Sequence, residues 1–125
     1  MLKQKRPVFL NLTQIHLPIT ALMSIAHRLT GVLLFIVLPF LVYILEQSLQ
    51  SKVGFASLYD GRDNLLLKIV LVILAWSLLH HLFAGIRYLL LDIDIGIQRQ
   101  QARNSAWSVT ILALIMAIAL VWMFL

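Results

Sequence analysis

The stretch that decides the fold is residues 106–125, AWSVTILALIMAIALVWMFL, which carry no ionisable side chain. A helix rises about 1.5 Å per residue, so about twenty apolar residues cross the ~30 Å hydrocarbon core of a bilayer. Two earlier apolar runs, residues 20–45 and 65–91, reach a similar length. We therefore predict an all-α membrane protein in which residues 1–125 form one transmembrane anchor domain with three spanning helices.

The composition excludes a soluble monomer. Hydrophobic residues make up 62% of the 125-residue chain and charged residues 12%, against about 45–50% and 25% in soluble domains. A chain this short cannot bury that much apolar surface in its own core. The sequence has no cysteine, which removes disulfides, iron–sulfur ligation and zinc–thiolate sites. The net charge of +5 fits membrane-flanking charge better than a nucleic-acid partner.

The basic residues predict the orientation in the membrane. After two crossings the chain is back on the side of its N-terminus, so the connection between the second and third spans lies there too, and this side holds seven Lys and Arg against three. The seven are Lys3, Lys5, Arg6, Arg28, Arg87, Arg99 and Arg103, and the three are Lys52, Arg62 and Lys68. Positive charge accumulates in cytoplasmic segments, so we predict a cytoplasmic N-terminus.

The first span begins with polar residues that are costly in lipid. Ser24, His27 and Arg28 stand at i, i+3 and i+4, which places them on one helix face near its cytoplasmic end. Ionisable residues inside a membrane mark a function or a buried partner. A hydroxyl, an imidazole and a guanidinium together suit an anionic or carbonyl ligand. The alternative is that Arg28 reaches the lipid headgroups and His27 lies at the interface.

The second span carries two adjacent imidazoles, His80 and His81. His81 lies eleven residues before Asp92, about 16 Å deep and near the bilayer midplane. Gly85 follows one turn later on the same face and leaves room for a flat ligand. With Arg87 nearer the surface, the pattern fits haem, and Gly85 favours His81 as the ligand. The alternative for either imidazole is a hydrogen bond between helices.

These motifs resemble a known family. The matching residues are Arg6-Pro7, Ser24-x-x-His27-Arg28-x-Thr30-Gly31, His81-x-x-x-Gly85-Ile86-Arg87 and Asp92. In this order they resemble the cytochrome b subunit of succinate dehydrogenase, the larger membrane anchor of succinate:quinone oxidoreductase, over nearly the whole chain. Tyr88 departs from the family, which often has His there. This departure concerns polar contacts near the haem edge, not iron ligation.

The resemblance implies a role for each polar residue in the spans. It makes His81 an axial ligand of haem b, with the second axial His supplied by a small partner anchor subunit that joins the bundle. It places Ser24 and Arg28 at the ubiquinone, His27 beside a haem propionate, and Arg87 as a second propionate contact. It assigns no catalytic residue and no activity to the chain alone.

The resemblance also implies the surrounding complex. Electrons pass from succinate through the FAD of a flavoprotein subunit and the clusters of an iron–sulfur subunit to quinone, linking the tricarboxylic acid cycle to the respiratory chain. The bacterial inner membrane is favoured over the mitochondrial inner membrane. The alternatives are the anchor of a fumarate reductase, a small carrier that moves protons or anions through His and Arg, and a purely structural anchor. A carrier predicts ionisable residues at all depths, whereas residues 106–125 have none.

Overall fold

The computed structural model describes residues 16–60 and 63–124. Within these ranges the chain forms helices and no strand: α1 (Ile19–Gln50), α2 (Lys52–Asp60), α3 (Leu65–Asp92) and α4 (Arg99–Phe124). Three of them, α1, α3 and α4, are long and apolar enough to cross a membrane. The prediction of an all-α fold with three spanning helices is therefore confirmed. Lys3, Lys5, the Arg6-Pro7 motif, Arg62 and the last residue of the third span lie outside the described residues.

The helices extend beyond the apolar runs. The third apolar run begins at residue 106, but α4 begins seven residues earlier, at Arg99. The interval between the first two runs contains the end of α1 and the short helix α2. Hydropathy detects the part of a helix that lies in lipid, whereas a helix continues into water wherever its backbone hydrogen bonds are satisfied.

Local residue chemistry sets where the helices begin. The side chain of Asn64 caps α3, because its Oδ1 accepts the backbone N–H groups of Leu66 at 2.8 Å and Leu67 at 3.3 Å. Pro18 precedes α1 in an extended conformation, and a proline is tolerated at that boundary because the first N–H groups of a helix have no partner. Pro39 lies inside α1, which continues through it.

The connection between α3 and α4 is short and closes in a Schellman motif. The N–H of Ile95 donates to the carbonyl of Leu90 at 2.9 Å, and the N–H of Asp94 donates to that of Leu91 at 3.0 Å. Asp94 adopts a φ of 63°, the left-handed conformation that ends many helices and that aspartate tolerates. The chain therefore reverses direction within six residues and returns as α4.

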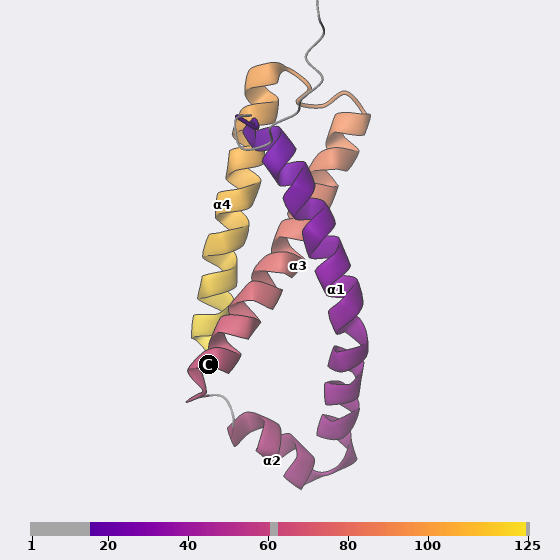
Figure 1. Cartoon of the computed structure of the whole chain (residues 1–125), viewed down its shortest axis with the longest axis vertical. Helices are drawn as coiled ribbons and strands as arrows, with labels where there is room; N and C mark the ends of the chain where they lie inside the picture. The colour runs from indigo at the N-terminus through magenta and orange to yellow at the C-terminus, as the bar shows by residue number, and fades with distance from the viewer. Residues whose placement is uncertain (1–15, 61–62, 125) are drawn as a thin grey trace, which may run out of the picture.

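Figure 1 shows α1 crossing α3 in the upper half of the view and diverging from it below, where α2 joins the lower ends. The most extensive helix contact is between α3 and α4. The buried residues on these helices are Ser77, His80, Ala84 and Arg87 on α3 and Ala106, Ala113 and Ala117 on α4. Most of these side chains are small, which allows membrane helices to approach closely.

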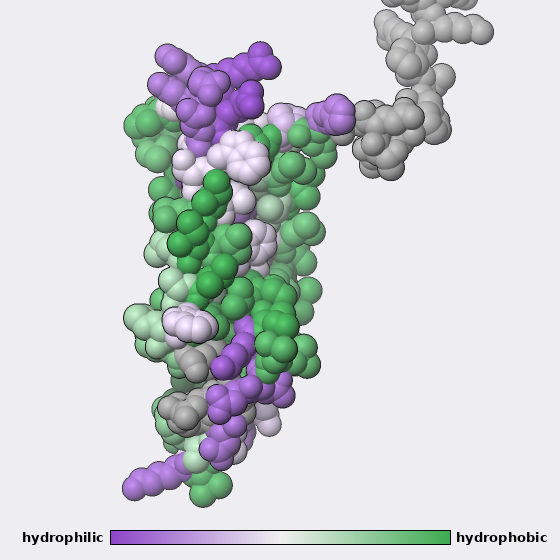
Figure 2. All heavy atoms as spheres, turned by 90° about the vertical axis from the view of Figure 1, so that its left-hand side faces the viewer, coloured by the Kyte–Doolittle hydropathy of each residue, from purple (hydrophilic) through white to green (hydrophobic). Residues whose placement is uncertain are grey.

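The outer surface of the bundle is largely apolar. The chain itself buries only 6%, 17% and 11% of the most apolar windows of α1, α3 and α4. Figure 2 shows a hydrophobic band between hydrophilic ends. Since water would not tolerate such a band, lipid or other membrane helices must cover it, and the chain is a membrane protein.

Candidate functional site

Two imidazoles meet where α1 crosses α3. The rings of His27 on α1 and His81 on α3 are stacked, with their centroids 4.1 Å apart and their planes 6° from parallel. Both residues are half-buried. The residues are 54 positions apart in the sequence, so only the packing of the two helices joins the two motifs.

One hydrogen bond fixes the protonation pattern of the His81 ring. His81 Nδ1 lies 3.0 Å from the backbone carbonyl oxygen of His27. A carbonyl can only accept, so Nδ1 must carry the proton and the neutral ring keeps its lone pair on Nε2. Thr30 supports this arrangement: its hydroxyl donates to the same carbonyl at 2.9 Å, and its Oγ1 lies 3.4 Å from His81 Nδ1.

Two glycines make room for these rings. A Cβ at Gly31 would lie 2.8 Å from His81 Cε1, closer than carbon atoms approach without displacement. A Cβ at Gly85 would lie 3.7 Å from His27 Nε2, an ordinary contact. A side chain at Gly31 would therefore displace the His81 ring. Gly85, where we predicted room for a flat ligand, faces the His27 imidazole.

The neighbouring imidazole of His80 has different surroundings. Its side chain is 0% exposed, and neither ring nitrogen has a hydrogen-bond partner among the described residues. Its ring lies 5.1 Å from that of Trp76. His80 also lies two turns before Arg87, which contacts α4, so both are on the face of α3 that packs against α4. Of the two adjacent histidines, His81 makes the ring stack and the hydrogen bond to α1.

The Arg87 side chain is hydrogen-bonded to α4. Its side chain is 6% exposed. Nε donates to the Ser105 hydroxyl at 2.8 Å, and Nη2 donates to the Ala102 carbonyl at 2.9 Å. The next residue, Tyr88, sets its ring edge-on to His27 at 5.2 Å. The propionate contact assigned to Arg87 remains a prediction, and the structure adds a role for its side chain in holding α3 to α4.

The predicted quinone residues lie on α1 on either side of His27: Ser24 one turn toward the helix start and Arg28 one residue toward its end. Ser24 is half-buried, and Arg28 is exposed. His27 turns its ring toward α3 while Arg28, one residue on, points to the outside. The structure thus brings His27 and His81 together and leaves Arg28 accessible from outside the chain. We did not predict the contacts of Thr30 and Gly31 with His81, although the glycine in an apolar run was a signal for close helix approach.

At the crossing, His81 is suited to be one ligand of a haem iron. Metal-bound histidines almost always donate their other ring N–H to a carboxylate, a carbonyl or water, and His81 donates to the His27 carbonyl. Within residues 16–60 and 63–124, no three His, Cys, Asp or Glu side chains are grouped to hold a metal ion. His81 therefore fits a metal whose other ligands come from outside the described chain, as the porphyrin nitrogens of haem do.

Comparison with known proteins gives the same family as the motifs. A family model described as the succinate dehydrogenase/fumarate reductase transmembrane subunit matches residues 3–120. The chain is 37% identical over 120 residues to the succinate dehydrogenase cytochrome b556 subunit of Coxiella burnetii, covering 94% of this chain and 96% of the relative. It is 33% identical over 118 residues to the subunit of that name in Rickettsia prowazekii, covering 93% and 90%. The match to the Paracoccus denitrificans subunit is 29% over 113 residues, covering 90% and 87%.

The match extends over all three spanning helices and both polar motifs, and the chain covers nearly the full length of these relatives. The chain therefore belongs to the family of succinate dehydrogenase/fumarate reductase transmembrane subunits.

Proposed function

We propose that this chain is the cytochrome b anchor subunit of a succinate dehydrogenase, binding haem b through His81 and forming part of the quinone reduction site with Ser24 and Arg28. The observation that carries the proposal is the hydrogen bond from His81 Nδ1 to the His27 carbonyl. It leaves the Nε2 lone pair available to iron, in a helix that crosses the membrane. The names of the relatives, which are cytochrome b556 subunits, support the same reading.

The chain contributes one histidine to the haem, and the small anchor subunit contributes the second. When bound, the haem would supply one-electron transfer. Around it, Thr30 and the His27 carbonyl orient the His81 ring, and Gly31 admits that ring against α1. In this proposal His27 and Arg87 contact the haem propionates.

At the quinone, Arg28 and Ser24 stabilise the reduced carbonyl. Reduction places negative charge on a quinone oxygen, and donors already in position stabilise such charge. The Arg28 guanidinium remains protonated, and the Ser24 hydroxyl can donate to the same oxygen. Arg28 is exposed, so it is accessible to a quinone held between this chain and its partners. The flavoprotein and iron–sulfur subunits dock on the same side, which is the cytoplasmic face of a bacterial inner membrane.

Leucine substitution at the two adjacent histidines tests the haem assignment. His81→Leu should abolish or strongly perturb the low-spin b-type spectrum of the purified complex, while His80→Leu should leave it largely intact. Retention of the other subunits is measured in both variants, so that loss of haem is separated from loss of assembly. A normal spectrum in His81→Leu, or loss of haem only in His80→Leu, would overturn the assignment.

The family description also names fumarate reductase, and the two complexes run the same reaction in opposite directions. All the relatives quoted above carry the succinate dehydrogenase name, which favours the succinate direction. Comparing the rates of succinate-driven quinone reduction and quinol-driven fumarate reduction in the same membranes distinguishes the two. A faster rate with fumarate would identify the anchor of a fumarate reductase.

A further inference from the structure

A pocket of about 670 Å³ lies at the end of the bundle where α1 and α4 begin. Residues 16–20 line one side, and the first turns of α4 line the other with Arg99, Arg103 and Trp107. Among the described residues, no Asp or Glu lines it. This pocket lies apart from the His27–His81 crossing, and neither the haem nor the quinone proposal uses its residues.

The two arginines lack a negative partner in the described chain. The first turn of α4 has no acidic residue, and the ion pair within residues 16–60 and 63–124 joins Lys68 to Asp63, not to either arginine. The N-terminus of a helix carries partial positive charge and favours anions. Two cations placed at this end repel that charge, and a bound anion would relieve the repulsion.

The position of the pocket along α4 matches the headgroup layer of a membrane. Trp107 and Trp122 are both exposed and lie fifteen residues apart, about 23 Å along the helix. Tryptophan favours both interfaces of a bilayer, so Trp107 marks one boundary of the hydrocarbon core. Arg103 lies about 6 Å beyond it and Arg99 about 12 Å.

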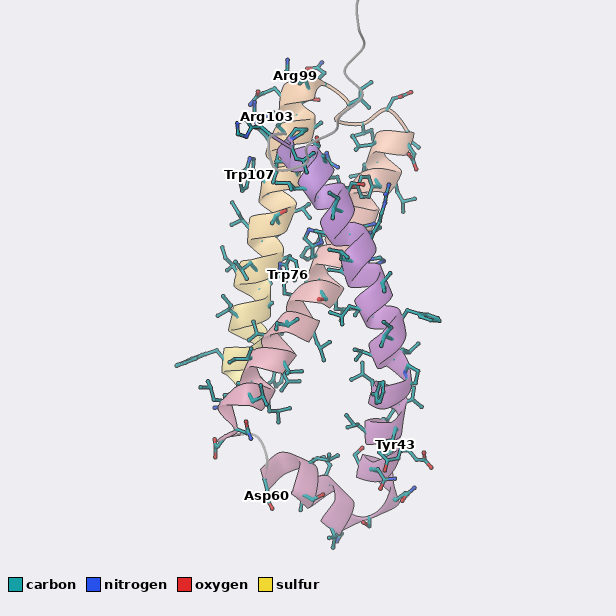
Figure 3. All side chains as sticks on the ribbon, viewed as in Figure 1. Tyr43, Asp60, Trp76, Arg99, Arg103 and Trp107 are labelled. Carbon is teal, nitrogen blue, oxygen red and sulfur yellow. The ribbon has the colours of Figure 1, made fainter. Side chains whose placement is uncertain are left out.

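The pocket continues into an apolar stripe along α4. Arg99, Arg103, Trp107 and Ile111 follow one another at intervals of four residues, so each is turned about 40° from the one before and the four form a slowly winding ridge along the helix. Figure 3 shows the two arginines and Trp107 along the outer side of α4, near its upper end. Trp107 is 50% exposed and Ile111 is 51% exposed. The ridge therefore changes from cationic to aromatic to aliphatic toward the membrane interior.

We propose that this pocket binds the phosphate headgroup of an anionic phospholipid. The guanidinium groups of Arg99 and Arg103 hold the phosphate, Trp107 lies beside the glycerol, and an acyl chain follows Ile111. Arginine is suited to phosphate because its planar donors can bind two oxygens at once. The continuous apolar stripe favours a lipid over an acidic protein segment, which has no tail to place there.

The test measures lipid binding by the full chain, purified in mild detergent with the subunits that remain attached. Phosphatidylglycerol and phosphatidylcholine are titrated separately, with native mass spectrometry to count bound lipid and the thermal midpoint to report stabilisation. A basic residue near a membrane surface strengthens binding of anionic lipid by roughly five-fold, so Arg99→Gln with Arg103→Gln should weaken phosphatidylglycerol binding by about 30-fold. Phosphatidylcholine binding should change little.

Two controls make the result specific, and the single variants provide a fallback. Lys52→Gln with Lys68→Gln removes two charges at the other end of the bundle and should leave this affinity unchanged. Arg99→Lys with Arg103→Lys keeps the charges and should retain most of the preference for the anionic lipid. If the double glutamine variant does not assemble, each single glutamine variant should still show a loss of roughly five-fold.

Three results would overturn the proposal. Phosphatidylglycerol affinity could be unchanged in the glutamine variants, so that the arginines bind no lipid. Inorganic phosphate could raise the midpoint as effectively as the lipid and with the same dependence on the arginines, so that the ligand is a free anion. The glutamine variants could release an attached subunit at unchanged lipid affinity, so that an acidic protein surface occupies the pocket.

Discussion

Replacing Gly31 with alanine tests the closest contact between α1 and α3. A Cβ at this position would lie 2.8 Å from His81 Cε1 and 3.3 Å from its Nδ1, whereas non-bonded carbon atoms prefer about 3.5–4.0 Å. The His81 ring would have to move by several tenths of an ångström. Its stack on His27 and its hydrogen bond to the His27 carbonyl both oppose that movement.

The expected magnitude follows from two opposing effects. Overpacking a close contact typically costs about 1–3 kcal/mol, and alanine gains up to about 1 kcal/mol over glycine inside a helix. With the middle of that cost, about 2 kcal/mol, offset by up to about 1 kcal/mol, Gly31→Ala should lower the free energy of unfolding by about 1–2 kcal/mol. Gly85→Ala is a matched control, because its Cβ would lie 3.7 Å from His27 Nε2. Gly85→Ala has the higher helix propensity of alanine without a close contact, so it should leave the free energy of unfolding unchanged or raise it by up to about 1 kcal/mol.

The assay compares the two variants with the parent complex in the same detergent. Gly31→Ala should lower the thermal midpoint and shift or weaken the b-type haem absorption, because the moved ring is the proposed iron ligand. Gly85→Ala should do neither. A parent-like midpoint and spectrum in Gly31→Ala would refute the close contact between the helices. An equal loss in both variants would instead indicate a general intolerance of side chains at this crossing.

Three further predictions concern the quinone, the haem and the helix interface. Arg28→Leu should cut succinate-driven quinone reduction severely, since a charged donor at a desolvated site contributes ~2–5 kcal/mol; Ser24→Ala should lose less, and oxidation of succinate by a flavin-linked dye should survive in both. A parallel fall in both activities would point to failed assembly. The chain expressed without its partners should bind haem poorly, and a stable bis-histidine spectrum from a monomer would contradict a partner-supplied ligand. Arg87→Met removes two buried hydrogen bonds to α4 and should lower stability by about 1–3 kcal/mol, measured as the thermal midpoint; an unchanged midpoint with a shifted haem reduction potential would favour the propionate role instead.

The sequence predicted the spanning helices well and their ends poorly. Residues 106–125 are apolar throughout, and hydropathy responds to the transfer of such side chains into lipid. The first turns of α4 are rich in Arg and Gln, which form helices readily in water but carry no hydropathy signal. The helix α2 was not predicted because its nine residues are too few to cross a membrane and so give no transmembrane signal.

The polar motifs predicted which residues matter but not how they meet. His27 and His81 were identified separately, from their cost in lipid and from the family resemblance. Their stacking depends on the crossing of α1 and α3, which no periodicity in either helix encodes. The spacing of His80 and Arg87 could have indicated a shared face, because seven residues complete almost two turns. Which helix packs against that face depends on the direction in which α4 runs back along α3, and this is known only from the folded structure.

The hydrogen bonds of Arg87 have a consequence for the biogenesis of the chain. An arginine within an inserting helix is costly, and both acceptors that offset this cost, on Ser105 and Ala102, lie at the start of the next helix. Because residues 93–98 form a short reversal, α3 and α4 can enter the bilayer together as a helical hairpin in which the guanidinium is already bonded. The newly made subunit thus carries no exposed arginine on α3 while it waits for its cofactor and its partners.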